Sequence, residues 1–242
     1  MNQTRILAID TSGTQANVAI LLSNGNDYII VGETTLNART GEKSWTHSEI
    51  LMPGVDSLLN LTGMDISDMD YIAYTQGPGS FTGLRIGAST ALGLANGLGK
   101  PCIPVPTLDA LAYNMLGVAS HGYVVPMMDA RRGQVYSAVY SFTQNRQLTR
   151  ITDYLALPVS EMLEQIPPSD NIYLLGDGVC ANKNAINIGT FVPPHNNRQR
   201  ASSLAICAAD MIKIASNQKN NNVELLYIRA PQAERDLHAK NS

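Results

Sequence analysis

Charged residues are scarce in this chain. Asp, Glu, Lys and Arg make up 15% of its 242 residues, whereas about 25% is usual for a soluble domain. The formal net charge is −3, and a chain that holds nucleic acid alone would be expected to carry a basic surface. The composition therefore argues against tight, independent nucleic-acid binding. The arginines that could still contribute are Arg131, Arg132, Arg198 and Arg200.

Cysteine and long apolar runs are scarce as well. The three cysteines, Cys102, Cys180 and Cys207, lie far apart and form no Cys-x-x-Cys pair, which argues against a disulfide framework. Reduced thiols are typical of cytosolic proteins. No apolar run approaches the roughly 20 residues of a membrane-spanning helix, and residues 5–10 read as a strand rather than a secretion signal. We expect a cytoplasmic protein without membrane contact.

Metal ligands and catalytic nucleophiles are also lacking. The sequence contains no His-x-x-x-His or His-Glu-x-x-His pair. Ser12, Ser80 and Cys102 have no base beside them in the sequence that would activate them. We therefore predict no metal site and no catalytic residue. The histidines all stand alone, as His47, His121, His195 and His238.

The first half of the chain alternates strands and helices. Three apolar runs joined by polar turns predict an antiparallel meander. Thr46 and Glu49 have the spacing of a capping box at the start of the first helix. This order predicts an α/β unit with helical crossovers. We expect strands over residues 6–9, 18–22, 28–36, 70–74 and 101–105, and helices over about 46–61, 82–98 and 107–115.

The second half repeats the order of three strands, a helix and a strand. The repetition predicts a duplicated fold of two related domains, 1–106 and 107–242, each with a mixed sheet flanked by helices. Ser160 is the expected cap of the helix over 158–166. The other expected elements are strands over 123–129, 134–142, 150–156 and 172–175, and a helix over 201–215.

Two turns could bind phosphate. Asp10, Ser12 and Gly13 follow the first strand, where backbone N–H groups can hold an anion and an aspartate can hold its metal ion. The glycine-rich turn 77–83 leads from a strand into a helix, where free N–H groups favour an anion, but it lacks the lysine of a Walker loop. The alternatives are an ordinary turn in the first case, and Ser80 acting as a helix cap in the second.

Several motifs resemble those of one known family. They are IDTS at 9–12, HSEILMP at 47–53, MDARRGQVY at 128–136, YIR at 227–229 and, most specifically, GPGSFTGLRIG at 77–87. Their order and spacing resemble the bacterial TsaB (YeaZ) family of tRNA threonylcarbamoyladenosine biosynthesis proteins over nearly the whole chain.

The resemblance implies an actin-like, or sugar-kinase-like, fold. It also implies a non-catalytic scaffold that helps to place threonylcarbamoyl on the adenosine beside the anticodon, in tRNAs reading codons that begin with A. The implied partners are a catalytic TsaD-like subunit and a TsaE-like ATPase, to which ATP and metal belong. This chain would meet tRNA through the complex and bind no cofactor of its own. The alternative is an active ATP-dependent phosphotransferase of the same fold.

The first two helices are the expected partner surface. Four small residues recur at every fourth position of the second helix, so a neighbouring backbone could approach closely. The alternative is that this stripe packs on the chain's own sheet. We predict that one patch serves both a homodimer and the pair with a TsaD-like subunit. Its expected residues are His47, Ile50, Leu51, Met52, Gly83, Gly87, Ala91 and Ala95.

Overall fold

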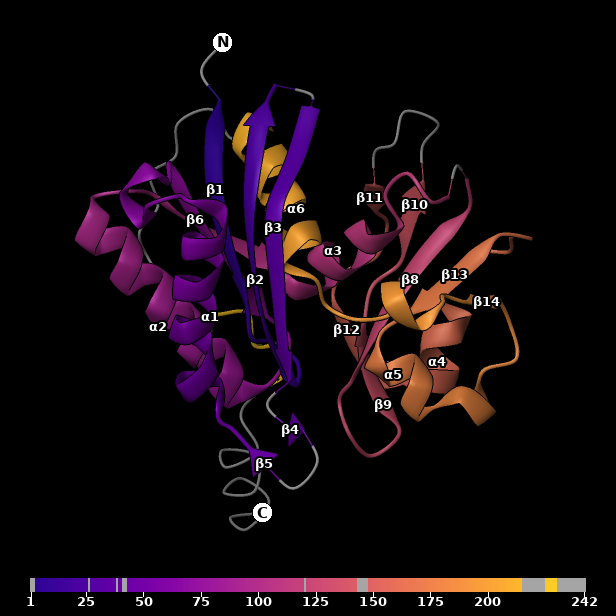
Figure 1. The fold of residues 1–242 in the computed structure, drawn as a ribbon. Helices are drawn as coiled ribbons and strands as arrows, with labels where there is room; N and C mark the ends of the chain where they lie inside the picture. Colours follow the sequence, from indigo (N-terminus) through magenta and orange to yellow (C-terminus); the bar gives the residue numbers. More distant parts are fainter. Residues whose placement is uncertain are drawn as a thin grey trace.

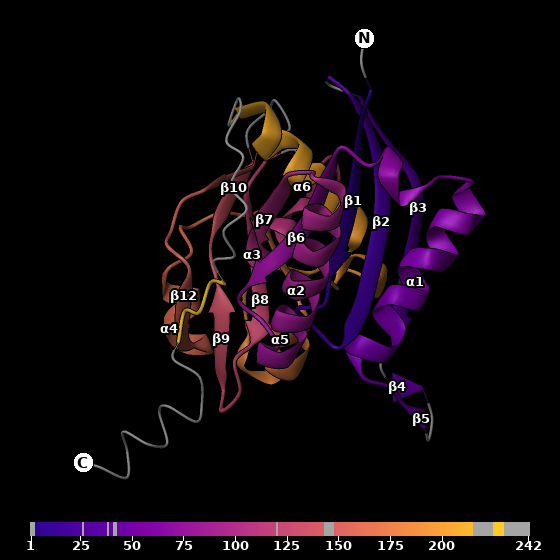
Figure 2. The ribbon, with the colours of Figure 1, turned by 90° about the vertical axis from the view of Figure 1, so that its left-hand side faces the viewer.

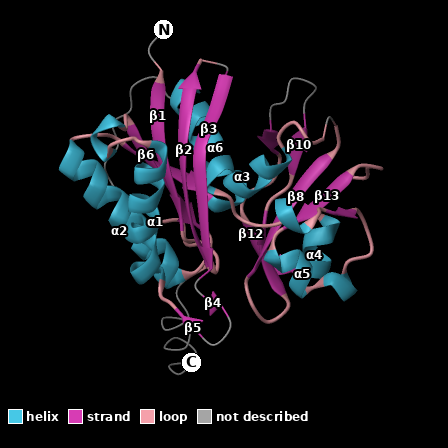
Figure 3. Cartoon of the chain, in the orientation of Figure 1, coloured by secondary structure: helices cyan, strands magenta, loops and turns pink. Residues whose placement is uncertain are grey.

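The chain folds into two sheets with helices against them (Figures 1 and 3). Both sheets are mixed, with parallel and antiparallel neighbours. The predicted α/β class with two mixed, helix-flanked sheets is therefore confirmed. The computed structural model describes residues 3–25, 27–37, 39–40, 43–119, 121–142, 148–214 and 225–229, with the backbone alone at 39, 40 and 43.

The first sheet has the strand order β3-β2-β1-β6-β7. Strands β1, β2 and β3 pair antiparallel, which confirms the predicted meander, while β6 and β7 add in parallel. Apolar side chains of β1 point to both faces, so both faces need a cover. The strands are β1 (Thr4–Asp10), β2 (Gln15–Asn24), β3 (Asp27–Asn37), β6 (Tyr71–Gly77) and β7 (Cys102–Pro106), and a separate small hairpin consists of β4 (Arg39–Thr40) and β5 (Lys43–Ser44).

Helices α1 (His47–Thr62) and α2 (Phe81–Leu98) cover one face of this sheet. The Glu49 carboxylate accepts the backbone N–H of Thr46 at 2.6 Å, so the predicted capping box forms. Gly63, in the left-handed conformation, ends α1. Figure 2 looks onto the side of the molecule where these two helices lie in front of the sheet.

The other face of the first sheet is covered by α6 (Ala201–Ile214). Its buried residues pack against β1 and β2, although α6 follows the whole second sheet in the sequence. The chain therefore returns to its first sheet with its last described helix. Helix α3 (Thr107–Ala112) lies between the two halves and contributes to the cores on both sides. The domain boundary at residues 106 and 107 stays a prediction.

The second sheet has the order β11-β10-β8-β13-β14, with β9 pairing β8 and β12. The strand expected over 134–142 is wrong as one element, because it divides into β9 and β10. The division lies opposite Pro126, which has no N–H to donate to a ladder. The strands are β8 (Tyr123–Asp129), β9 (Gln134–Ser137), β10 (Tyr140–Phe142), β11 (Leu148–Arg150), β12 (Leu155–Pro158), β13 (Ile172–Leu175) and β14 (Thr190–Phe191).

Short helices complete the second half. Helix α4 starts at Val159 with Pro158 at the capping position, so the expectation that Ser160 caps it is wrong. None of the helices in the described part of the chain is long and apolar enough to span a membrane. The remaining elements are α4 (Val159–Glu164), α5 (Asp177–Ala181) and the 3₁₀ turns η1 (Ile66–Asp68), η2 (Tyr113–Met115), η3 (Lys183–Ala185) and η4 (Pro194–Asn196).

Candidate functional site

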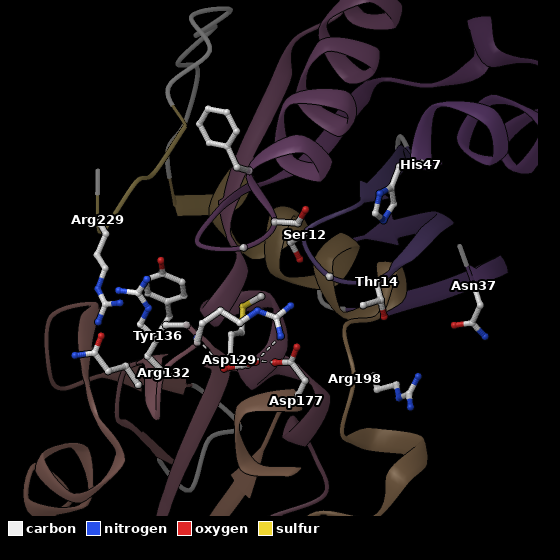
Figure 4. Close-up of a pocket in the computed structure, with 18 of the residues that line it drawn as sticks. Ser12, Thr14, Asn37, His47, Asp129, Arg132, Tyr136, Asp177, Arg198 and Arg229 are labelled. Carbon is white, nitrogen blue, oxygen red and sulfur yellow. Dashed lines mark hydrogen bonds and ion pairs between the residues drawn. The ribbon is translucent and has the colours of Figure 1, made fainter. Parts of the chain in front are cut away.

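A cleft of about 930 Å³ lies between the two halves of the molecule (Figure 4). From the first half it is lined by the turn after β1 and by the start of α2. From the second half it is lined by the β8–β9 turn and by the start of α5. Small ligands often bind in clefts of this kind, between two packed parts of a protein. Its lining includes Ser12, Gly13, Ser80, Asp129, Arg132 and Arg198.

Asp10 does not line the cleft. Its side chain is buried, with 1% of its surface exposed. One carboxylate oxygen accepts the backbone N–H and the hydroxyl of Ser12 at 2.8 and 2.7 Å, and the hydroxyl of Thr75 at 3.0 Å. Burial raises the pKa of the Asp10 carboxyl above its ordinary value, although these hydrogen bonds lower it in part. Asp10 is therefore buried beneath the first turn, which it stabilises through one carboxylate oxygen, and it is not among the residues that line the cleft.

Ser12 and Gly13 do line the cleft. The N–H and hydroxyl of Ser12 are already donated to Asp10. Gly13 lies against the side chain of Gln199, whose Oε1 would be 3.1 Å from a Cβ at that position. The two hydrogen-bond donors of Ser12 are therefore not free to bind an anion, although the sequence of the turn predicted an anion site.

The start of α2 is occupied in a similar way. The backbone N–H of Ser80 donates to the carbonyl of Ser12 at 2.7 Å. The hydroxyl of Ser80 accepts the N–H of Gly83 at 3.2 Å, so Ser80 caps the helix. The capping alternative is the one that the structure realises. A backbone hydrogen bond thus joins the two candidate phosphate turns.

Within the described residues, no three His, Cys, Asp or Glu side chains come together as a metal-binding group. Burial raises the pKa of the Cys102 thiol to about 12, so it is protonated at neutral pH.

The β8–β9 turn directs two arginines into the cleft. Arg131 and Arg132 both have left-handed backbone angles, φ 66° and 55°, which are uncommon for residues other than glycine. Arg131 pairs with Asp129 at 3.1 Å. The turn was predicted from the sequence, but its strain was not. Of the other arginines singled out, Arg198 lines the cleft, whereas Arg200 is held by Glu33 at 3.0 Å on the first sheet.

A segment near the C-terminus joins the two halves beside the cleft. The N–H of Leu226 donates to the carbonyl of Gln76 at 2.8 Å, and the Tyr227 ring lies 5.5 Å from that of Phe81. Arg229 reaches the second half, where it donates to the carbonyl of Ala156 at 3.4 Å and lines the cleft. The motif at 227–229 was noted for its resemblance alone. Its contacts could not be found from sequence, because they join residues about 70 to 150 positions apart.

The small-residue stripe of α2 packs on the chain's own sheet. Ala91 and Ala95 are fully buried in the core with β1 residues. A Cβ on Gly83 would lie 2.1 Å from the Thr11 carbonyl oxygen, and one on Gly87 would lie 2.3 Å from the Thr11 hydroxyl. This corrects the expectation that the stripe faces a partner, because α2 needs these small residues to approach β1.

The predicted interface residues of α1 also divide by burial. Leu51 is buried in the core, and Ile50 is half-buried against the same core. His47 is half-buried and lines the cleft. Met52, with 37% of its surface exposed, points outward. Of these four residues, Met52 therefore offers the most surface to a partner.

Sequence reasoning missed a second row of small residues on α2. Ser89, Gly93 and Gly97 are exposed and lie four positions apart on the face opposite the buried stripe. Apart from the adjoining backbone of α2 itself, no heavy atom of the described chain lies within 4 Å of a Cβ built on Gly93 or Gly97. A shallow groove of about 480 Å³ begins beside this row, along Phe81 and Arg85. We call this exposed row and its groove the outer face of α2.

Comparison with known proteins agrees with this architecture. A family model described as TsaD, tRNA N6-adenosine threonylcarbamoyltransferase, matches residues 29–240. The tRNA threonylcarbamoyladenosine biosynthesis protein TsaB of Bacillus subtilis is 35% identical over 182 residues, which cover 75% of this chain and 74% of that protein. The protein of the same name from Haemophilus influenzae is 31% identical over 191 residues, with 75% of each chain covered.

Among solved structures, YeaZ from Pseudomonas aeruginosa has a TM-score of 0.76 and 23% identity, over 93% of this chain and 100% of that one. This likeness shows the fold, and the predicted actin-like class with two mixed sheets is confirmed. Together with the identities above, it leads to one conclusion: this chain belongs to the TsaB (YeaZ) family.

Proposed function

We propose that this chain is a non-catalytic subunit of the machinery that forms threonylcarbamoyladenosine in tRNA. Membership of the TsaB family supports a part in this process, which the names of its curated relatives state. In the proposal, a TsaD-like subunit carries the transfer chemistry and a TsaE-like ATPase joins the pair. This chain supplies a surface on which the catalytic subunit is held.

The observation that carries the proposal is that donors in both candidate phosphate turns are engaged in hydrogen bonds within the chain. The N–H and the hydroxyl of Ser12 are donated to the Asp10 carboxylate, and the N–H of Ser80 is donated to the carbonyl of Ser12. An active phosphotransferase needs free N–H groups for phosphate and an accessible carboxylate for the metal ion. Asp10 is buried and Ser80 is a cap, so the phosphotransferase alternative has less support.

The partner surface in this proposal is the outer face of α2 together with Met52 of α1. Exposed small residues let another helix approach closely, and α1 and α2 lie side by side on one side of the molecule (Figure 2). Two helices from each of two chains would form a four-helix interface. The same face would serve a homodimer when the chain is alone.

A reconstituted transfer assay tests the proposal. The purified chain is given tRNA and the threonylcarbamoyl donor, first alone and then with its TsaD-like and TsaE-like partners. We expect no modified adenosine from the chain alone, and a strong stimulation when it joins the partners. Modification by the chain alone, free of any TsaD-like protein, would contradict the non-catalytic role.

A further inference from the structure

Positive side chains are concentrated in the cleft of a chain that is acidic as a whole. Arg132 and Arg198 line the cleft and are exposed. Among the described residues, neither has a carboxylate within ion-pair distance. Arg229 adds a third guanidinium, held by a carbonyl rather than a carboxylate. Because no carboxylate in the described part of the chain neutralises these three charges, they are available to an anionic ligand.

The arrangement of these charges favours an extended anion. Figure 4 shows Arg132 and Arg229 on one side of the cleft and Arg198 on the other, with Asp129 and Asp177 between them. A compact polyphosphate in the middle would face two carboxylates. An extended chain of phosphates can instead contact the arginines at both ends and place neutral groups beside the carboxylates.

Aromatic side chains line the same cleft. Trp45 is 46% exposed and Phe81 38% exposed. The Arg85 guanidinium lies 3.8 Å from the centre of the Phe81 ring and the Tyr227 ring lies beside it, so Trp45 is the ring that stays open to a ligand. Trp45 is the single tryptophan of the chain. An exposed ring in a cleft that also carries arginines is a group on which an unpaired base can stack, and single strands are bound in this way without strong sequence preference.

Backbone strain points to the same turn. Arg131 and Arg132 both have left-handed backbone angles, a conformation that glycine and asparagine adopt at lower energetic cost than arginine. Such strain collects at binding and catalytic sites, where orientation matters more than stability. The Asp129 carboxylate accepts the backbone N–H of Arg131 at 2.8 Å and pairs with its guanidinium, whereas Arg132 lines the cleft without such a partner among the described residues.

We propose that this cleft binds a short unpaired segment of RNA, with the arginines on phosphates and Trp45 against a base. The inference deepens the proposed function and rests on it, because the process acts on tRNA. A mononucleotide suits the cleft less well, since Ser12 and Ser80, which would face its phosphates, already donate their N–H groups within the chain. The isolated chain binds weakly, and the complex adds its own contacts to the same RNA.

The test follows the fluorescence of Trp45 in the full chain. A short oligoadenylate, a duplex RNA of equal length and ATP are each titrated at several salt concentrations. Single-stranded RNA is expected to quench Trp45, with the logarithm of the association constant falling by about 0.7 per phosphate contact for each unit of log salt. Three arginine contacts therefore predict a slope of about −2.

Single variants assign the contacts. Arg132→Gln and Arg198→Gln are each expected to reduce the steepness of that slope by about 0.7. Arg150→Gln is the matched control, because Arg150 lies on β11, is paired with Asp153 and is not among the cleft-lining residues. It should leave binding unchanged. Trp45→Phe, followed with labelled RNA, should retain binding, whereas Trp45→Ala should weaken it.

Several results would overturn the inference. These are no quenching by oligoadenylate, equal quenching by duplex RNA or by ATP, and equal slopes for the cleft variants and the Arg150 control. Pairing with the TsaD-like subunit is measured on the same samples. A chain that pairs but shows no RNA signal refutes the cleft assignment alone. A chain that binds RNA but never pairs refutes the proposed scaffold role and leaves the cleft assignment standing.

Discussion

The two faces of α2 carry the same pattern of small residues and use it differently. Gly83, Gly87, Ala91 and Ala95 bring the helix against β1, and the chain's own atoms fill the space beside them. On the opposite face, Gly93 and Gly97 have open space around them. A row of small residues therefore marks a close approach of backbone, but it does not say whether the approaching backbone belongs to the same chain.

The largest effect is expected from Ala91→Arg on the inner face. Ala91 is fully buried among apolar residues, so the guanidinium would have no partner there. A buried, uncompensated charge costs on the order of 3–5 kcal/mol. Urea unfolding of the isolated chain measures the loss. A variant as stable as wild type would show that the stripe is not internal.

A smaller loss is expected from Ala95→Leu, which adds volume to the same buried row without adding charge. Overpacking of this kind costs about 1–3 kcal/mol. The midpoint of urea unfolding should fall, while its slope stays constant because the unfolded surface is the same. An unchanged midpoint would show that the core beside α2 can hold a leucine at this position without overpacking.

On the outer face, Gly93→Arg should leave the fold intact and even strengthen it. Arginine is the better helix former by up to about 1 kcal/mol, and its side chain enters open space. Thermal unfolding of the monomer measures the gain. The contrast with Ala91→Arg is sharp, because the same side chain is introduced two positions away on one helix. If Gly93→Arg destabilised the monomer, the conclusion that the outer face of α2 has open space would be wrong.

The last prediction concerns the pH dependence of the unfolding free energy, which the buried carboxyl of Asp10 influences. Burial raises the pKa of Asp10 in the folded chain above its unfolded value. Between these two pKa values the folded state holds a proton that the unfolded state releases, so the unfolding free energy falls as pH rises through that window. Asp10→Asn should flatten this fall in urea titrations carried upward from pH 3.8, the ordinary pKa of an aspartate. Asp56→Asn, an exposed change on α1, is the control, and equal pH profiles for the two variants would refute the assignment.

Local patterns in the sequence predicted most of the first half. The meander, the capping box of Thr46 and Glu49, and the extent of α2 depend on neighbouring residues, and the structure confirms them. The break between β9 and β10 was missed because it depends on Pro126 in another strand. Likewise, the return of α6 to the first sheet depends on contacts across nearly 200 positions.

The candidate site was less predictable for the same reason. The sequence suggested that Ser12 and Ser80 each had donors to offer, but not that the two turns would satisfy one another. The stripe of α2 was read correctly as a packing signal, although periodicity alone could not choose its partner. The cleft needs Trp45, Arg132 and Arg198 together, and folding brings them from three distant segments.

The pairing of this chain with its TsaD-like partner tests the central claim most directly. Affinity is measured by sedimentation for wild type, Gly93→Arg and Ser160→Arg, the last placing the same charge on an exposed position of α4. Because an unpaired charge buried at an interface costs about 2–5 kcal/mol, Gly93→Arg should weaken pairing by on the order of 100-fold, while Ser160→Arg should match wild type. A folded Gly93→Arg that pairs as tightly as wild type would contradict the account.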